Sequence, residues 1–231
     1  MLLRALLPVR CPGCGATAPA GPSPCGRCAA GLRPAPGGPC PAGLDACWSL
    51  FAYQDVGRQV VTSLKYHRDR TVLAWLAAGM AALASPPSAV VVTWAPTTEA
   101  RRRRRGFDQA ELLAGAVARR WGAPCAPLLA RKGGPPQTGR SLADRRAGPI
   151  VLARAGSRAV AAGRPVVIVD DVLTTGTTLS ASARALETVD VGWVAGLTAA
   201  RTPRAGASPP CVLAASPPVE EFAQVRGLTG R

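Results

Sequence analysis

The sequence predicts an α/β fold in which helices flank a parallel sheet, and three apolar runs predict it. Residues 89–93 read Ala-Val-Val-Val-Thr, residues 166–169 read Val-Val-Ile-Val, and residues 192–200 form the third run. Continuous apolar runs are typical of strands that are buried on both faces, as in parallel sheets. Segments with apolar residues at helical spacing alternate with these runs, as an α/β fold requires. Helices are expected at residues 55–66, 71–83 and 177–189, and a further helix is expected to follow residues 106–110 and to end at Trp121.

Two adjacent carboxylates, Asp170 and Asp171, come where the strand of residues 166–169 should end. Ligands of open α/β sheets bind beyond the carboxyl ends of the strands. Paired carboxylates there accept hydrogen bonds from hydroxyls or hold a hydrated divalent cation. The next residues, Thr174-Thr-Gly-Thr-Thr178, offer four hydroxyls and backbone N–H groups directly before a helix, which is a cradle for an anion. A ribose 5-phosphate combines vicinal hydroxyls with a phosphate in the matching layout.

Two other interpretations of residues 166–179 compete with a ligand site. The metal-holding strand of a P-loop ATPase also ends in acids, but the motif G-x-x-x-x-G-K-[ST] occurs nowhere upstream. A structural loop capped by Thr is the second interpretation. It does not explain why acids, hydroxyls and Gly coincide, so the ligand site is favoured.

The composition indicates a soluble globular protein with an excess of positive charge. Of 231 residues, 48% are hydrophobic, which is enough for a sizeable core. The 28 basic and 13 acidic residues give a net charge of +15, which is typical of polyanion binders, although GC-biased coding explains so many Arg equally well. Residues 1–9 do not form a convincing secretory signal, and the apolar run 71–84 is shorter than the roughly 20 residues that cross a bilayer. A cytoplasmic location is therefore expected.

Four cysteines near the N-terminus form two C-x2-C pairs: Cys11, Cys14, Cys25 and Cys28. Cysteines of a cytoplasmic protein bind metals or stay reduced more often than they form disulfides. Four thiolates make a closed, structural zinc site, and a segment so poor in large apolar residues needs a metal to fold. A redox C-x-x-C pair is the alternative, but no βαβ pattern surrounds either pair.

Composition also divides the chain in two. Residues 1–47 are expected to form a cysteine-rich zinc module with its linker, and residues 48–231 an α/β domain with a partly irregular tail from about residue 201. Gly and Pro dominate residues 31–43, which excludes a helix or a central strand there. Cys40 and Cys47 remain ambiguous, either as remnants of a second metal site or as substitute ligands.

Two basic segments border the expected site. Residues 101–105 are five consecutive Arg, which form either a solvated face or a phosphate-binding patch. Residues 131–146 mix Gly, Pro and Arg, which predicts a mobile basic loop. Such a loop beside a diphosphate site closes over the substrate and excludes water, while a solvated surface loop is the plain alternative.

Residues 166–179 resemble the phosphoribosyl-diphosphate (PRPP) signature of type I phosphoribosyltransferases. Lys65-Tyr66, the loop with Pro96, and Arg105-Gly-Phe-Asp-Gln-Ala110 together resemble the ComF family, in which a zinc module precedes a phosphoribosyltransferase-like domain. That family commonly has Asn where this chain has Asp108. The resemblance implies that the paired acids bind the ribose hydroxyls with magnesium, and that Thr174 to Thr178 surround the 5-phosphate.

The resemblance also implies a role for individual residues. Catalysis falls to Asp170, Asp171, Arg105 and Lys132. PRPP binding falls to Asp170, Asp171, Thr174, Thr175, Gly176, Thr177, Thr178, Thr97 and Thr98. The flexible loop contributes Arg131, Gln137 and Arg145.

Two functions from different classes fit these residues. The first is a magnesium-dependent phosphoribosyltransferase that displaces pyrophosphate from PRPP. The second is a non-catalytic competence factor that supports DNA uptake by binding single-stranded DNA and a helicase partner. The positive charge and the zinc module favour the second function, and a homo-oligomer is compatible with both.

Overall fold

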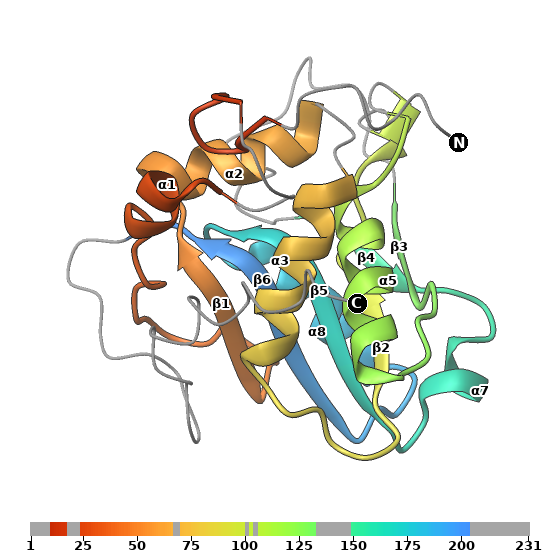
Figure 1. The fold of residues 1–231 in the computed structure, drawn as a ribbon. Helices are drawn as coiled ribbons and strands as arrows, with labels where there is room; N and C mark the ends of the chain where they lie inside the picture. Colours follow the sequence, from red (N-terminus) through yellow and green to blue (C-terminus); the bar gives the residue numbers. More distant parts are fainter. Residues whose placement is uncertain are drawn as a thin grey trace, which may run out of the picture.

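A four-stranded parallel sheet, with the order β1-β6-β5-β2, forms the centre of the molecule (Figure 1). The computed structural model describes residues 10–17, 24–66, 70–99, 102–103, 106–132 and 149–203. The strands are β1 (Ala46–Ala52), β2 (Val91–Trp94), β5 (Pro165–Leu173) and β6 (Trp193–Arg201). Each neighbouring pair is parallel, so the predicted α/β fold with a parallel sheet is confirmed.

Helices cover both faces of this sheet. In Figure 1, α3 and α5 lie in front of the strands and α8 lies behind them. A two-stranded antiparallel sheet and a short helix pack on the same side as α8. No helix within the described ranges has the length and apolarity needed to cross a bilayer. The remaining elements are α1 (Gly26–Ala30), α2 (Asp55–Tyr66), α3 (Arg70–Ala82), α5 (Gln109–Trp121), β3 (Leu129–Arg131), β4 (Val151–Ala153), α7 (Ser157–Ala161) and α8 (Thr177–Glu187).

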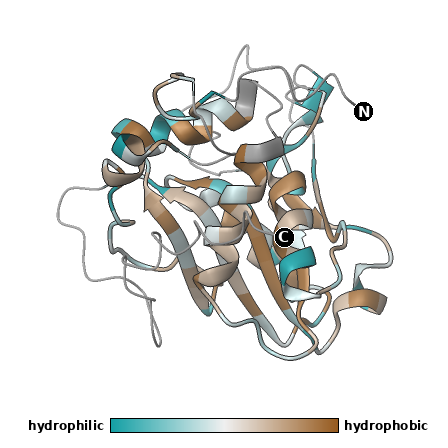
Figure 2. Ribbon diagram, viewed as in Figure 1, coloured by the Kyte–Doolittle hydropathy of each residue, from teal (hydrophilic) through white to brown (hydrophobic). Residues whose placement is uncertain are grey.

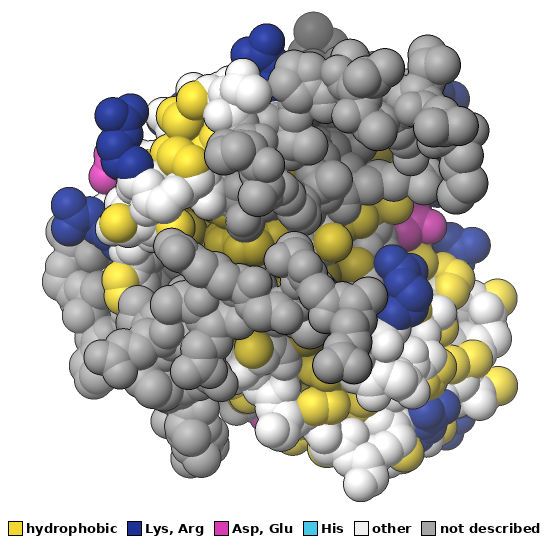
Figure 3. All heavy atoms as spheres, in the orientation of Figure 1, with side chains coloured by type: hydrophobic (Ala, Val, Ile, Leu, Met, Phe, Trp, Pro, Cys, Tyr) yellow, Lys and Arg dark blue, Asp and Glu magenta, His cyan; other side chains and the backbone are white. Residues whose placement is uncertain are grey.

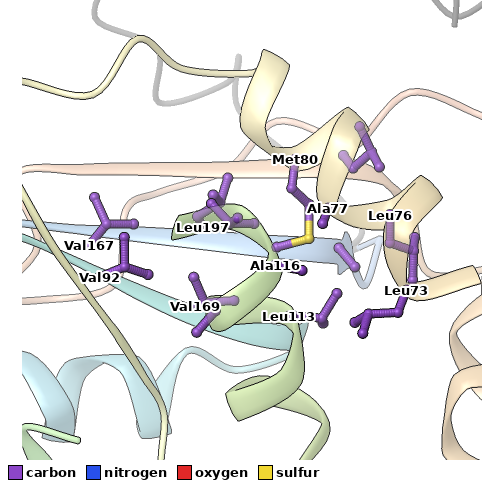
Figure 4. Close-up of a cluster of buried hydrophobic side chains, with 14 of the residues drawn as sticks. Leu73, Leu76, Ala77, Met80, Val92, Leu113, Ala116, Val167, Val169 and Leu197 are labelled. Carbon is purple, nitrogen blue, oxygen red and sulfur yellow. The ribbon is translucent and has the colours of Figure 1, made fainter. Parts of the chain in front are cut away.

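The apolar run at the start of β5 separates two hydrophobic clusters. Val167 and Val169 point into the cluster under α3 and α5, where Met80 and Leu113 meet them (Figure 4). Val166 and Ile168 point into the cluster under α8. Side chains alternate between faces along a strand, so a strand with helices on both sides must be apolar at every position. Figure 2 shows the same pattern as brown strands between the two helical layers.

Strand β1 is the strand of the central sheet that the sequence patterns do not predict. Cys47, the expected end of the zinc module, lies inside this strand and is buried. The apolar run of β1 is interrupted by Ser49, whose hydroxyl lies 2.7 Å from that of Thr198 in β6. The hydrogen bond between the two hydroxyls lets a polar residue lie in the middle of the strand. The polar residue interrupts the apolar run, so a search for continuous apolar runs does not find β1.

Candidate functional site

The aspartates Asp170 and Asp171 lie within β5, not after it, which corrects the expectation that the strand ends at Val169. The strand continues because its neighbour β6 pairs with it as far as Leu173, opposite Arg201. On the other side, β2 ends at Trp94, opposite Val169. Both aspartates are half-buried and lie past the end of β2, at the carboxyl edge of the sheet.

A small hollow of about 20 Å³, called the first hollow here, lies where β5 meets α8. Its walls are Asp170 and residues 172–179, which include the whole of Thr174 to Thr178, called the phosphate turn from here on. Three hydroxyl-bearing side chains of the turn are exposed, and the hydroxyls of Thr175 and Thr177 are 3.0 Å apart. The structure therefore brings Asp170 and the phosphate turn together, while Asp171 is not among the residues that line the first hollow.

Gly176 gives the phosphate turn its shape. Its φ of +80° is left-handed, and a Cβ there would lie 2.9 Å from Pro41. Gly176→Ala should therefore lower the free energy of unfolding by about 1–2 kcal/mol through backbone strain, in addition to the clash with Pro41. Urea unfolding measures the change.

The matched control for this prediction is Gly115→Ala in α5. Its new Cβ would have only the Arg119 side chain nearby, at 3.6 Å. Ala within a helix is favoured over Gly by about 0.5–1 kcal/mol, so this variant should be more stable than the wild type. Equal effects of the two substitutions would contradict the strained turn.

The loop after β2 is tied to α5 by Asp108. One carboxylate oxygen accepts a hydrogen bond from the Ala110 N–H at 3.0 Å and caps the helix. The other oxygen accepts from the Thr97 N–H at 3.4 Å. Thr97 and Thr98 are half-buried and belong to the loop that the resemblance assigns to PRPP binding. Asp108 thus positions a predicted binding loop, a role that the sequence analysis does not assign to it.

Burial raises the pKa of Asp108, although N–H groups of Thr97, Ala110 and Glu111 partly oppose the rise. The folded protein therefore holds a proton on Asp108 at a pH at which the unfolded chain has lost it. This contribution to stability is complete below the usual Asp pKa of about 4 and is lost as the pH rises through the raised value.

Asp108→Asn should keep the helix cap and make stability depend less on pH in that window, because Asn does not ionise. Asp108→Ala should lose the cap and about 1 kcal/mol of stability at every pH. Thermal unfolding of both variants between weakly acidic and neutral pH measures this. An unchanged pH profile in Asp108→Asn would refute the role of the Asp108 proton.

The other predicted site residues are spread more widely. Lys132 is exposed after β3, and its N–H donates to the Ile150 carbonyl at 3.0 Å. Arg131 pairs with Val151 in the small sheet. Neither residue lines the first hollow. Arg105, Gln137 and Arg145 lie outside the described residues.

The four cysteines Cys11, Cys14, Cys25 and Cys28 form one cluster, in which all four sulfur atoms lie within 4.8 Å of one another. The Sγ atoms of Cys14 and Cys25 are 3.8 Å apart. A tetrahedral zinc with Zn–S bonds of about 2.3 Å places its sulfur ligands about 3.8 Å apart, so the arrangement fits this metal. Cys40 and Cys47 do not belong to the cluster.

Backbone N–H groups make one thiol of the cluster acidic. Burial raises the pKa of Cys11, but N–H groups of Cys25, Cys14 and Gly13 outweigh it and bring the pKa to about 6. The Cys25 N–H lies 3.3 Å from the Cys11 sulfur. Burial raises the pKa of Cys28 to about 12, and the neighbouring cysteines add to the rise. A bound cation would favour the thiolate form of all four cysteines, which is the form that binds metals.

The cluster is packed against the α/β domain. A Cβ on Gly13 would meet the Cys28 sulfur at 2.8 Å and Val56 of α2 at 3.2 Å. The segment that follows is anchored to the end of β1, where the Ala52 N–H donates to the Arg33 carbonyl at 2.9 Å. In Figure 1, α1 accordingly lies near the arrowheads of β1 and β6, at the same edge of the sheet as the aspartates.

Comparison with known families finds a match that contains the phosphate turn. Residues 108–209 match the phosphoribosyl transferase domain. This match begins at Asp108 and contains β5, the phosphate turn, α8 and β6. It does not include the cysteine cluster or the loop with Thr97. Among curated proteins, none matches the chain.

Several solved structures are similar to parts of the chain. One is an allosteric regulatory enzyme of purine biosynthesis, with 24% identity over 55% of this chain and 26% of that one, at a TM-score of 0.38. Another is the glutamine PRPP amidotransferase from B. subtilis, with 22% identity over 66% of this chain and 32% of that one, at a TM-score of 0.40. An adenine phosphoribosyltransferase from Thermoanaerobacter pseudethanolicus has 21% identity over 57% of this chain and 82% of that one, at a TM-score of 0.36. The chain spans about a third or less of the length of the first two.

Proposed function

We propose that this protein is a phosphoribosyltransferase of the ComF type, which binds PRPP with magnesium and transfers its phosphoribosyl group with release of pyrophosphate. One observation carries the proposal: Asp170 and all five residues of the phosphate turn line a single hollow. That hollow lies within the region that matches the phosphoribosyl transferase domain.

The phosphate turn would hold the 5-phosphate of PRPP. Its exposed hydroxyls are hydrogen-bond donors, and the N-terminus of the eleven-residue helix α8 adds backbone N–H groups and a positive partial charge. Asp170, on the same hollow, would accept hydrogen bonds from the ribose hydroxyls. Asp171 is assigned the same role by the resemblance alone.

Transfer requires that the leaving pyrophosphate be stabilised while positive charge develops on the ribose. The loop with Thr97 and Thr98 would contact the pyrophosphate, because Asp108 fixes it at the carboxyl edge of the sheet. Carboxylate oxygens of Asp170 and Asp171 suit magnesium, which when bound with PRPP would offset the charge of the leaving group. Orientation and charge stabilisation suffice for such a reaction, so no dedicated general base is required.

A second candidate function is a non-catalytic competence factor in the cytoplasm, which binds single-stranded DNA and a helicase partner. The net charge of +15 favours it, and Arg102 and Arg103 are exposed next to the Thr97 loop. On the face drawn in Figure 3, however, the described Lys and Arg side chains lie in separate groups and not in one continuous patch. In this function a zinc in the cysteine cluster would be structural, and a homo-oligomer would enlarge the basic surface.

Calorimetric titration with PRPP, with and without magnesium, tests the proposal. The expected result is binding that magnesium strengthens, followed by pyrophosphate release when a suitable acceptor is added. PRPP binding without turnover against any acceptor, together with single-strand DNA binding that weakens steeply with salt, would favour the competence factor. No binding of PRPP at all would refute the phosphoribosyltransferase and leave the competence factor.

A further inference from the structure

A second hollow, of about 180 Å³, lies beside the phosphate turn. Leu173, Thr174 and Thr175 line both hollows, so these residues form a wall between them. The other walls come from three separate parts of the chain: residues 39–42 before β1, Ser180 of α8, and Arg201 at the end of β6. No role is assigned to this hollow by the sequence motifs.

Residues 39–42 are fixed in place over the turn. The Arg201 Nη2 donates to the Pro39 carbonyl at 2.7 Å. Pro41 lies against Gly176, at a distance that only glycine permits. The Leu44 N–H donates back to the Pro41 carbonyl at 3.2 Å. The second hollow therefore has walls that are held by hydrogen bonds and packing.

The chemistry of the lining favours an anion. Arg201 carries five N–H donors, and the described hydrogen bond to Pro39 uses one of its nitrogens. Ser180 and Thr175, which bear hydroxyls, also line this hollow, and none of the residues that line it is acidic. Guanidinium and hydroxyl donors facing one space bind carboxylates and phosphates through charge-assisted hydrogen bonds.

The size of the second hollow limits what it takes. A cavity of about 150 Å³ accommodates a benzene-sized molecule, so a small anion or one ring that bears an anionic group fits a hollow of about 180 Å³. Because the wall of this hollow is the phosphate turn, its occupant would lie next to a sugar phosphate in the first hollow.

We propose that the second hollow binds the anionic group of the acceptor, and that the acceptor is therefore a small molecule that carries a carboxylate or a phosphate. That the ligand is the acceptor of the reaction rests on the proposed function. That an anion binds beside the phosphate turn does not depend on the proposed function.

The test uses ring probes that differ in charge: benzoate, phenyl phosphate and neutral benzamide. Each is titrated into the full chain with saturating ribose 5-phosphate, so that the phosphate turn is occupied. We expect benzoate or phenyl phosphate to bind at least about tenfold more tightly than benzamide, and the tighter of the two anions identifies the group.

Two variants locate the binding. Ala42 is exposed on the rim of the second hollow and does not line the first, so a side chain added there leaves the phosphate turn untouched. Ala42→Asp should lower the affinity for the anionic probe about tenfold by repulsion, while the isosteric Ala42→Asn should bind it like the wild type. Equal binding of benzoate and benzamide, or equal loss in the two variants, would overturn the proposal.

A PRPP titration of the same variants separates this inference from the proposed function. Ala42→Asn should retain the PRPP affinity of the wild type, and Ala42→Asp should lower the PRPP affinity less than it lowers the affinity for the anionic probe. If PRPP fails to bind but the anionic probe still distinguishes Ala42→Asp from Ala42→Asn, the proposed function fails and the anion site stands. If PRPP binds and the probes do not distinguish the two variants, only the second hollow is refuted.

Discussion

Replacing Cys14 by Ser should abolish the zinc binding that we propose for the cysteine cluster and lower the stability of the whole protein. Cys14 is exposed, so the substitution removes a ligand without opening a cavity in a core. Structural zinc contributes about 10–16 kcal/mol of binding free energy in small zinc-binding peptides, and one lost thiolate removes much of it. Elemental analysis of purified protein gives the metal content, and thermal unfolding gives the stability.

Cys125→Ser is the matched control for this prediction. Its thiol is also exposed, and it lies outside the cluster. This variant should keep full metal content and the wild-type unfolding midpoint. A Cys14→Ser protein that retains one zinc per chain would show that the four sulfur atoms do not form the ligand set.

Replacing both Asp170 and Asp171 by Asn should abolish magnesium-dependent binding of PRPP. A hydrogen bond to a charged group contributes about 1.5–3 kcal/mol, so each lost carboxylate contact lowers the affinity about 10-fold to 100-fold. The structure predicts that Asp170→Asn alone has the larger effect, because Asp170 lines the first hollow and Asp171 does not. Calorimetric titration of the two single variants and the double variant measures this.

Asp190→Asn controls for the loss of a carboxylate elsewhere. Asp190 is exposed, pairs with Arg158 on the surface, and has a φ of +57°, which Asn tolerates. Its PRPP affinity should equal that of the wild type. An Asp170→Asn protein with unchanged affinity in the presence of magnesium would disprove the ribose site.

The local part of the site follows from the sequence. The apolar run of β5, the paired acids and the threonine-rich turn are neighbours in the chain, so their signals reinforce one another. The cap by Asp108 also has a local signal, because Glu111 follows it three residues later as in a capping box.

The second hollow could not be predicted in the same way. The hydrogen bond between Arg201 and Pro39 joins residues 162 positions apart, and no periodicity or motif specifies that contact. Pro-rich and Gly-rich residues 31–43 read as a linker because their composition excludes regular structure. Their packing against α8 and the phosphate turn depends on tertiary contacts, which local sequence patterns do not predict.

The pairing of β1 with β6 sets the order in which the chain completes its fold. Ser49 and Thr198 are 149 residues apart and meet side by side in the sheet. During synthesis β1 leaves the ribosome early and has no partner until β6 has been translated, and such late closure slows folding and exposes strand edges. In the nascent protein the edge of β1 that pairs with β6 therefore stays exposed until β6 has been made. Truncated chains that end before Trp193 lack β6 and should be prone to aggregation.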